Sequence, residues 1–259
     1  MKTELFLLSA KTIFVFMNMM FLIAQFKKDN SIVDIGWGLG FLAVTTGLML
    51  STGLQSLVHL GFLLMIFLWA LRLAGYIFKR NRGTGEDYRY AAWREEWGKN
   101  VVWRAYLQVF MLQGIIMWVV LSPSYAVFSN PESQFGLPHF IGISLWIIGF
   151  YFEGVGDAQM MRFKADSANK GKVMNRGLWK LTRHPNYFGE ALLWWGFGIY
   201  SFTPEMWWLS ILGPAVITFF LLKVSGVVML EKKYDGNSKY AEYKRMTNAF
   251  IPWFPKKQP

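Results

Sequence analysis

The sequence predicts an all-α integral membrane protein: a bundle of seven transmembrane helices with cytoplasmic loops and a C-terminal amphipathic helix. Of the 259 residues, 54% are hydrophobic, more than soluble domains usually contain. Several apolar runs reach about 18 residues, the length that a bilayer requires of a helix. Lysines and arginines gather in alternate loops, as the positive-inside rule describes. We therefore expect one membrane domain that covers residues 1–259.

Apolar runs and prolines place the individual helices. Pro123 lacks an N–H donor and is expected to kink or end the fourth span. Pro138 and Pro185 suit the first turns of the fifth and sixth spans, where a missing N–H costs little. The sixth span is short for a bilayer. The seven spans are predicted at 4–26, 33–51, 56–78, 105–128, 138–160, 186–202 and 206–231.

The last part of the chain has the pattern of an interfacial helix. Between Asn237 and Phe254, aromatic and aliphatic residues recur at helical spacing among lysines and arginines. This pattern predicts an amphipathic helix that lies along the membrane surface. Its apolar positions are Tyr240, Tyr243, Met246 and Phe250.

Charge and cysteine content exclude several classes of protein. The chain has no cysteine, so it forms no disulfide and no cysteine-ligated metal site. Its net charge of +11 is explained by basic cytoplasmic loops, and we expect no nucleic-acid partner. The same loops place the N-terminus outside and the C-terminus in the cytoplasm.

Charged residues also occur inside the predicted spans, where each is costly and tends to be functional. Lys11 lies near the outer side, where its long side chain can reach the headgroups. The others fall in the cytoplasmic half of the bundle. They have two interpretations, which are compatible: structural ion pairs between helices, or the lining of a polar cavity open to the cytoplasm. They are Asp34, Arg72, Glu153, Asp157, Glu190, Lys223 and Glu231.

Two cytoplasmic loops are rich in basic residues and glycine. Residues 79–90 read KRNRGTGEDYRY, and residues 164–177 read KADSANKGKVMNRG. Neither is a phosphate-binding loop of the Gly-Lys-Ser/Thr type or a dinucleotide-binding GxGxxG turn. One interpretation is contact with anionic lipids. The other is a phosphate-bearing soluble cofactor that enters from the cytoplasm and is held by arginine and lysine side chains.

Residue spacing places several polar groups on common helix faces. Glu153 and Asp157 are four residues apart, as are Asn186 and Glu190, so each pair shares a face. A helix that begins near Pro185 directs its N-terminus to the cytoplasm, where its dipole favours an anion. His184 is far from the other two histidines, which map to the outer side, and we expect no metal site.

The segment GLWKLTRHPNYFGE (177–190), followed by ALLWWG, resembles the steroid 5α-reductase superfamily, and specifically its bacterial DUF1295-type members. LRLAGYIFKRNRGTGEDYRY (71–90) and the C-terminal YAEYKRMTNAFIPWFP are similar to the same pattern. The resemblance implies a seven-helix bundle in the bacterial inner membrane that binds NADPH. It further implies hydride transfer to the β-carbon of an enone, such as the 4,5 double bond of a 3-oxo-Δ4 steroid. The expected partners are this lipophilic substrate and membrane lipids, with the protein as a monomer.

The resemblance also implies roles for individual residues. Glu190 matches a glutamate of the Asn-x-x-Gly-Glu block and is predicted to be catalytic. Asp34 falls at the position of a glutamate that polarises the substrate carbonyl. Trp69 occupies the position of its tyrosine partner, so Tyr76 or Tyr88 is expected to substitute, and we assign Tyr88. The predicted cofactor-binding residues are Arg72, Arg80, Arg82, Glu153, Asp157, Lys164, Lys172, Arg183, His184, Asn186, Tyr187 and Lys223.

Two other functions remain compatible with the sequence. Isoprenylcysteine carboxyl methyltransferases carry a similar Arg-His-Pro-x-Tyr motif, so an S-adenosylmethionine-dependent methyltransferase acting on a lipid or prenyl substrate is the main alternative. A non-enzymatic lipid-binding or scaffold protein is the second. The identity of the cofactor separates these three functions.

Overall fold

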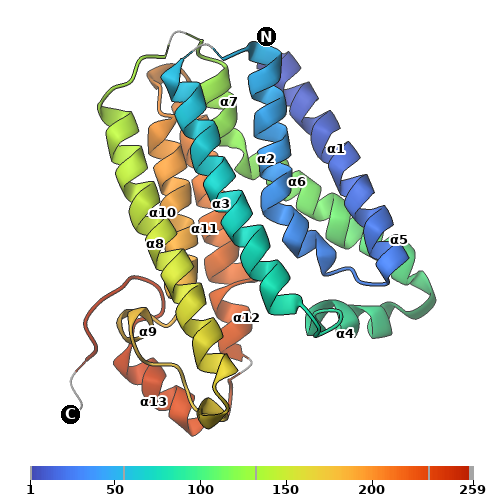
Figure 1. Cartoon of the computed structure of the whole chain (residues 1–259), viewed down its shortest axis with the longest axis vertical. Coiled ribbons are helices and arrows are strands. Elements are labelled where there is room, and N and C mark those ends of the chain that lie inside the picture. The colour runs from blue at the N-terminus through green and yellow to red at the C-terminus, as the bar shows by residue number, and fades with distance from the viewer. Residues whose placement is uncertain (1, 55, 132, 233, 257–259) are drawn as a thin grey trace. The chain divides into compact units, whose positions relative to one another are not determined.

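The computed structural model describes residues 2–54, 56–131, 133–232 and 234–256. Helices make up most of this length, and the described residues contain no β-strand (Figure 1). Internal contacts divide the chain into two compact units. The first unit comprises Met1–Gly136 and Ser201–Leu212, and the second comprises Leu137–Tyr200 and Gly213–Pro259.

The predicted all-α membrane fold is confirmed, although the number of spans differs from the prediction. Six helical segments among the described residues are long and apolar enough to cross a membrane. The remaining predicted span corresponds to α10 (Pro185–Tyr200), whose 16 residues extend about 24 Å, less than the ~30 Å of a bilayer core. The count of seven therefore stays a prediction. The six segments are Thr3–Lys27, Ile32–Thr52, Leu57–Asn81, Tyr88–Val120, Leu137–Ala165 and Pro204–Lys232.

Three long helices form the centre of the first unit. α2 (Ile32–Thr52) packs against both α1 (Lys2–Lys27) and α3 (Leu57–Asn81). Gly38 of α2 permits the close approach to α3, because a Cβ added there would lie 3.0 Å from the Cα of Ala70. Glycine at this contact therefore fixes how closely the two helices pack.

The predicted fourth span is a series of shorter helices. It begins earlier than predicted, because α4 (Tyr88–Trp97) already forms within the expected loop. Pro123 lies in the first turn of α7, directly after α6 ends, so the predicted break is confirmed. The remaining helices of this series are η1 (Gly98–Asn100), α5 (Val101–Ala105), the π-helix η2 (Tyr106–Met111), α6 (Leu112–Val120) and α7 (Ser122–Phe128).

A line of glycines joins the two main helices of the second unit. α8 (Leu137–Ala165) and α10 lie side by side (Figure 1). Gly142 and Gly149 recur every seven residues along α8, so they fall on one face. A Cβ at Gly149 would lie 2.5 Å from the backbone nitrogen of Leu193, and one at Gly196 would lie 2.7 Å from that of Trp146. The two backbones therefore touch, and no side chain fits between them at these points.

Several short helices complete the chain. α9 (Leu178–Leu181) precedes α10, and η4 (Pro204–Met206) follows it. α11 (Trp207–Phe219) continues into the π-helical turn η5 (Phe220–Val224) and then α12 (Val227–Lys232). The 3-10 turn η3 (Ser167–Asn169) and α13 (Ser238–Met246) are the remaining elements.

The C-terminal helix is shorter than predicted and its apolar face is covered. α13 ends at Met246, and Thr247 is already extended. Tyr240 and Tyr243 are buried, and the hydroxyl of Tyr243 donates a hydrogen bond to the carbonyl of Trp179. Both tyrosines, which we expect at the membrane surface, are thus buried within the protein, and the carbonyl of Trp179 in α9 binds the hydroxyl of Tyr243.

We predict that Gly149→Ala lowers the thermal unfolding midpoint, because a methyl group would force α8 and α10 apart. Overpacking of this kind costs about 1–3 kcal/mol. Gly75→Ala in α3 is the matched control, since a Cβ there meets nothing within 4 Å and alanine favours a helix. Differential scanning fluorimetry of both variants in detergent measures the effect. Equal midpoints for the two variants would contradict the packing described here.

Candidate functional site

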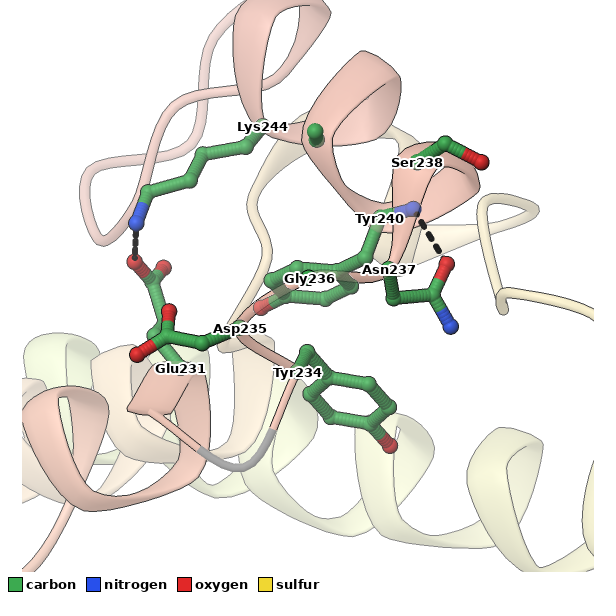
Figure 2. Close-up of a pocket in the computed structure, with 9 residues that line it drawn as sticks. Glu231, Tyr234, Asp235, Gly236, Asn237, Ser238, Tyr240 and Lys244 are labelled. Carbon is green, nitrogen blue, oxygen red and sulfur yellow. Dashed lines mark hydrogen bonds and ion pairs between the residues drawn. The ribbon is translucent and has the colours of Figure 1, made fainter.

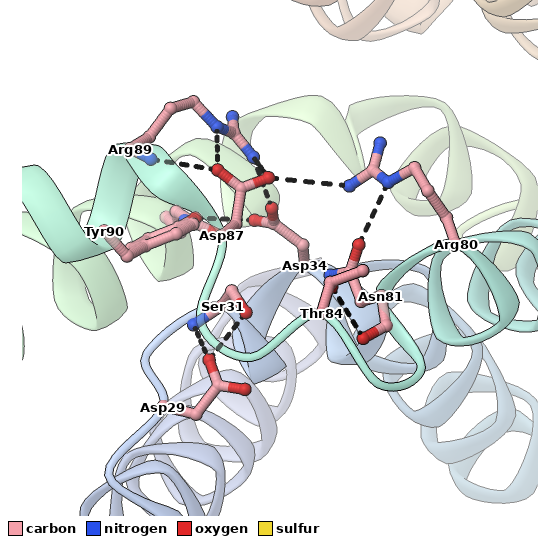
Figure 3. A network of polar contacts seen from close by, with 10 residues as sticks. Asp29, Ser31, Asp34, Arg80, Asn81, Thr84, Asp87, Arg89 and Tyr90 are labelled. Carbon is pink, nitrogen blue, oxygen red and sulfur yellow. Dashed lines mark hydrogen bonds and ion pairs between the residues drawn. The ribbon is translucent and has the colours of Figure 1, made fainter. Parts of the chain in front are cut away.

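In the first unit, Asp34 is the centre of a polar network at the start of α2 (Figure 3). The hydroxyl of Tyr90 donates a hydrogen bond of 2.6 Å to Oδ1 of Asp34. Arg89 Nη2 donates to Oδ2 at 2.8 Å. Both donors come from α4, so this short helix determines the surroundings of the carboxylate.

Two acidic residues that precede α4 position these donors. Asp87 caps the helix by accepting a hydrogen bond from the backbone N–H of Arg89. It also binds the Nε of Arg89 at 2.9 Å, and Arg80 approaches it at 3.9 Å. Glu86 accepts from Arg94 Nε at 2.8 Å and from the backbone of Asn30 at 2.7 Å. The GEDYRY sequence therefore fixes the start of α4 over the start of α2.

The phenol that contacts Asp34 is that of Tyr90, and the catalytic role of Tyr88 stays a prediction. The side chain of Tyr88 is 55% exposed, whereas Tyr90 is 4% exposed. The position of Tyr90 could have been predicted from Asp87. This residue caps a helix that begins at Tyr88, and Tyr90 then lies on its buried face. Three of the predicted cofactor-binding residues are arginines of this unit. Arg80 contacts the network through Asp87, Arg72 is half-buried in α3, and Arg82 is exposed.

In the second unit, α8 and α10 bring together predicted residues that are far apart in the sequence. Asn186 Nδ2 donates a hydrogen bond of 3.1 Å to Asp157 Oδ1. Glu190 Oε1 accepts one from Trp194 Nε1 at 3.0 Å. Glu153 and Asp157 are each 4% exposed, and Glu190 is 8% exposed. The glycine contact thus places three buried carboxyl groups and an amide on adjacent turns.

Two buried polar side-chain atoms at the start of α10 have unused hydrogen-bonding capacity. Within the described part of the chain, neither Asn186 Oδ1 nor His184 Nδ1 has a hydrogen-bond partner. The amide orientation of Asn186 follows from chemistry, because the carboxylate of Asp157 must receive the N–H side. The oxygen therefore faces away from Asp157, and buried acceptors of this kind call for a partner.

Arg183 and His184 are held by Glu231, a residue absent from the predicted site. Arg183 Nη2 lies 2.6 Å from Glu231 Oε1, and His184 Nε2 lies 3.3 Å from the same oxygen. Arg183 Nη1 also donates to the carbonyl of Thr247 at 2.5 Å. Every nitrogen of this guanidinium is thus bound within the protein, so Arg183 links α10 to the C-terminal segment. The role of both residues in cofactor binding stays a prediction.

The same carboxylate borders a small pocket of about 260 Å³ (Figure 2). Lys244 Nζ lies 2.9 Å from Glu231 Oε2. Tyr240 stacks on Tyr234 with ring centroids 4.4 Å apart. Burial, assisted by Glu231, raises the pKa of Tyr240 to about 12, so this phenol keeps its proton at neutral pH.

The remaining predicted residues have different surroundings. Tyr187 stacks on the ring of His184, with ring centroids 5.6 Å apart, which places it at the entry of α10. Lys164 lies in the last turn of α8 and Lys223 lies on η5, and both are exposed. Lys172 lies in the loop before α9, where it lines a cavity of about 410 Å³. Among the described residues, no group of three His, Asp or Glu side chains is arranged to hold a metal.

Comparison with known proteins identifies the family. A model of the DUF1295 family, described as proteins of unknown function, matches residues 20–247. The chain therefore belongs to the DUF1295 family, and the predicted resemblance is confirmed at this level. No solved structure matches the chain.

The curated relatives carry more specific names. An uncharacterized protein of Schizosaccharomyces pombe is 26% identical over 73% of this chain and 62% of its own length. A steroid 5-alpha-reductase of Arabidopsis thaliana is 32% identical over 44% of this chain and 40% of its own length. A very-long-chain enoyl-CoA reductase of Dictyostelium discoideum is 30% identical over 29% of this chain and 25% of its own length. The chain thus matches less than two thirds of each of these relatives.

We predict that Glu86→Gln makes the protein less sensitive to acid. Burial alone would raise the pKa of Glu86, but hydrogen bonds from Arg94 and the backbone of Asn30 lower it below 4.5. The stabilisation is therefore fully present above pH 4.5 and is lost as the pH falls through the lowered folded-state pKa. Unfolding midpoints of the wild type and the variant, measured from about pH 7 down to about pH 3, test this prediction. Parallel curves would contradict this assignment.

Proposed function

We propose that the protein is an NADPH-dependent membrane reductase that saturates the carbon–carbon double bond of a lipophilic enone, such as the 4,5 double bond of a 3-oxo-Δ4 steroid. The main observation in support of this proposal is the buried Asp157–Asn186 pair. The amide oxygen of Asn186 has no hydrogen-bond partner among the described residues. The names of the steroid 5-alpha-reductase and the enoyl-CoA reductase support it. Both names denote reduction of a double bond conjugated to a carbonyl group.

The residues at the start of α10 fit a nicotinamide cofactor. Asn186 Oδ1 is a buried acceptor, and a carboxamide N–H₂ supplies the donor that it lacks. His184 gives its Nε2 side to Glu231, so a neutral ring offers Nδ1 as a second acceptor. When bound, NADPH supplies the hydride. We propose that Asp157 holds the amide of Asn186 in the orientation that binds it, and that Glu190 is catalytic, as its place in the Asn-x-x-Gly-Glu block predicts.

The Asp34–Tyr90 pair is our candidate for the group that polarises the substrate carbonyl. Hydride addition at the β-carbon puts negative charge on the carbonyl oxygen, and a positioned hydrogen-bond donor stabilises that charge. The carbonyl then re-forms as a proton is added at the neighbouring carbon. Tyr90 donates a hydrogen bond of 2.6 Å to Asp34, and Arg89 keeps the carboxylate in place. We therefore transfer to Tyr90 the role that the sequence assigned to Tyr88.

Basic loops support a specific orientation in the membrane. We propose that the protein lies in the bacterial inner membrane with its N-terminus outside, and with its cofactor site and C-terminus in the cytoplasm. The exposed Lys164 and Lys172 then face the compartment that contains NADPH. The substrate reaches the protein from within the bilayer.

We predict that NADPH raises the unfolding midpoint of the purified protein more than NADH or S-adenosylmethionine does. A ligand that binds only the folded state stabilises it by about 2.7 kcal/mol at one hundred times its Kd. Thermal scans at matched ligand concentrations make the comparison. Stabilisation by S-adenosylmethionine alone would refute the reductase and favour the methyltransferase. A protein that responds to none of the three would favour a lipid-binding or scaffold role.

We predict that Tyr90→Phe lowers kcat for reduction of progesterone by at least about tenfold, because removal of one oxyanion-stabilising donor costs about 10²–10³ in rate. The Kd for NADPH should stay the same. Tyr88→Phe is the matched control and should keep near wild-type turnover, since Tyr88 is half exposed. NADPH-coupled assays in membranes measure both variants. A loss of kcat in Tyr88→Phe but not in Tyr90→Phe would assign the catalytic role to Tyr88.

A further inference from the structure

The last part of the chain exposes three large apolar side chains outside any span. Ile251, Trp253 and Phe254 are 67%, 68% and 78% exposed. They follow the last candidate span, which ends at Lys232. They are the most exposed large apolar residues between that span and the C-terminal end of the described chain.

Backbone hydrogen bonds hold this segment in a fixed position on the second unit. The N–H of Trp253 donates to the carbonyl of Leu181 at 2.9 Å. Thr182 Oγ1 donates to the carbonyl of Phe250 at 2.9 Å. The N–H of Lys256 donates to the carbonyl of Met246, also at 2.9 Å. The segment is anchored at both ends, so its apolar side chains are presented outward and not folded back onto α13.

A basic cavity adjoins this apolar segment. It has a volume of about 410 Å³ and is bordered by Pro255, the residue that follows Phe254. Lys172, Lys180 and Lys239 line it, and Glu242 is the carboxylate among its lining residues. Three ammonium groups against one carboxylate give the cavity a net positive charge, which suits a phosphate-bearing anion.

We propose that the segment Ile251–Phe254 and the lysine cavity together bind an anionic phospholipid at the membrane surface. The phosphate group is held by the lysines, while Trp253 and Phe254 enter the boundary between headgroups and acyl chains. Tryptophan is enriched at this depth of the bilayer, and each basic residue near an anionic surface contributes about 1 kcal/mol. The adjacent apolar and basic surfaces match the two parts of such a lipid. An apolar protein partner would leave the lysines without a counter-charge.

The absence of cysteine in the chain permits a direct test with single nitroxide labels on the full-length protein in lipid nanodiscs. A label at Phe254→Cys should be more accessible to oxygen than to a water-soluble nickel chelate. Ser238→Cys is the control, because Ser238 is exposed at the start of α13 and should favour the chelate. Equal chelate accessibility at both sites would overturn the proposal. Line broadening that grows with protein density would instead identify a second copy of this chain as the partner.

A second pair of variants tests the lysine cavity. The label at position 254 should lie deeper in discs of phosphatidylcholine and phosphatidylglycerol than in discs of phosphatidylcholine alone. Lys180→Gln/Lys239→Gln should abolish this difference in depth. Lys170→Gln/Arg176→Gln removes the same charge from the preceding loop, outside the cavity, and should keep the difference. Identical behaviour of the two double variants would overturn the assignment of the headgroup. Lys172 stays intact in both, so the result is independent of its predicted role in cofactor binding.

An excess of soluble glycerol phosphate distinguishes a lipid headgroup from a free phosphate compound. Immersion of the label at position 254 should persist in its presence, because the acyl chains and the headgroup belong to one lipid. The contact of the acyl chains with the apolar segment then keeps the headgroup at the cavity. Loss of the lipid dependence at millimolar glycerol phosphate would show that the cavity binds free phosphate esters, and would overturn the lipid proposal.

Discussion

The direct backbone contact between α8 and α10 is the constraint on which the polar residues of the second unit depend. Gly149 and Gly196 leave no room for a side chain between the helices. Asp157 and Asn186 can therefore form a hydrogen bond although they come from different helices. A larger separation would break this bond and leave a buried carboxylate without its donor, which is costly in a low-dielectric interior. Small residues at a helix interface thus create the geometry of the site.

The charged residues at the helix ends illustrate how structural and functional roles combine. Glu231 binds Arg183, His184 and Lys244, and so joins the last span to α10 and α13. This network corresponds to the structural interpretation of the buried charges. The Asp157–Asn186 pair, with its unpartnered amide oxygen among the described residues, agrees with the interpretation as a binding site. The ion-pair interpretation is therefore observed for Glu231, whereas the binding-site interpretation stays a prediction for Asp157 and Asn186.

The sequence predicted the helices better than the contacts of individual side chains. Apolar runs and prolines located the long helices, because burial in a membrane and the missing N–H of proline are local constraints. Apolar runs and prolines do not reveal that α4 forms inside a charged loop. This helix depends on the cap that Asp87 provides and on the contact of Tyr90 with Asp34, which lies 56 residues earlier in the chain. Glu231 was recognised as a buried charge but not as the partner of Arg183, 48 residues earlier. Long-range pairing of this kind leaves no periodic pattern in one sequence.

We propose that the α8–α10 contact presents Asn186 to a nicotinamide cofactor. The most direct test is a fluorescence titration of NADPH against the wild type and Asn186→Leu, which keeps a similar volume but removes the amide. We expect Kd to rise at least about tenfold for the variant, the equivalent of about 1.4 kcal/mol, and to stay unchanged for the control Gly75→Ala. Equal affinity of Asn186→Leu and the wild type would show that Asn186 does not bind the cofactor.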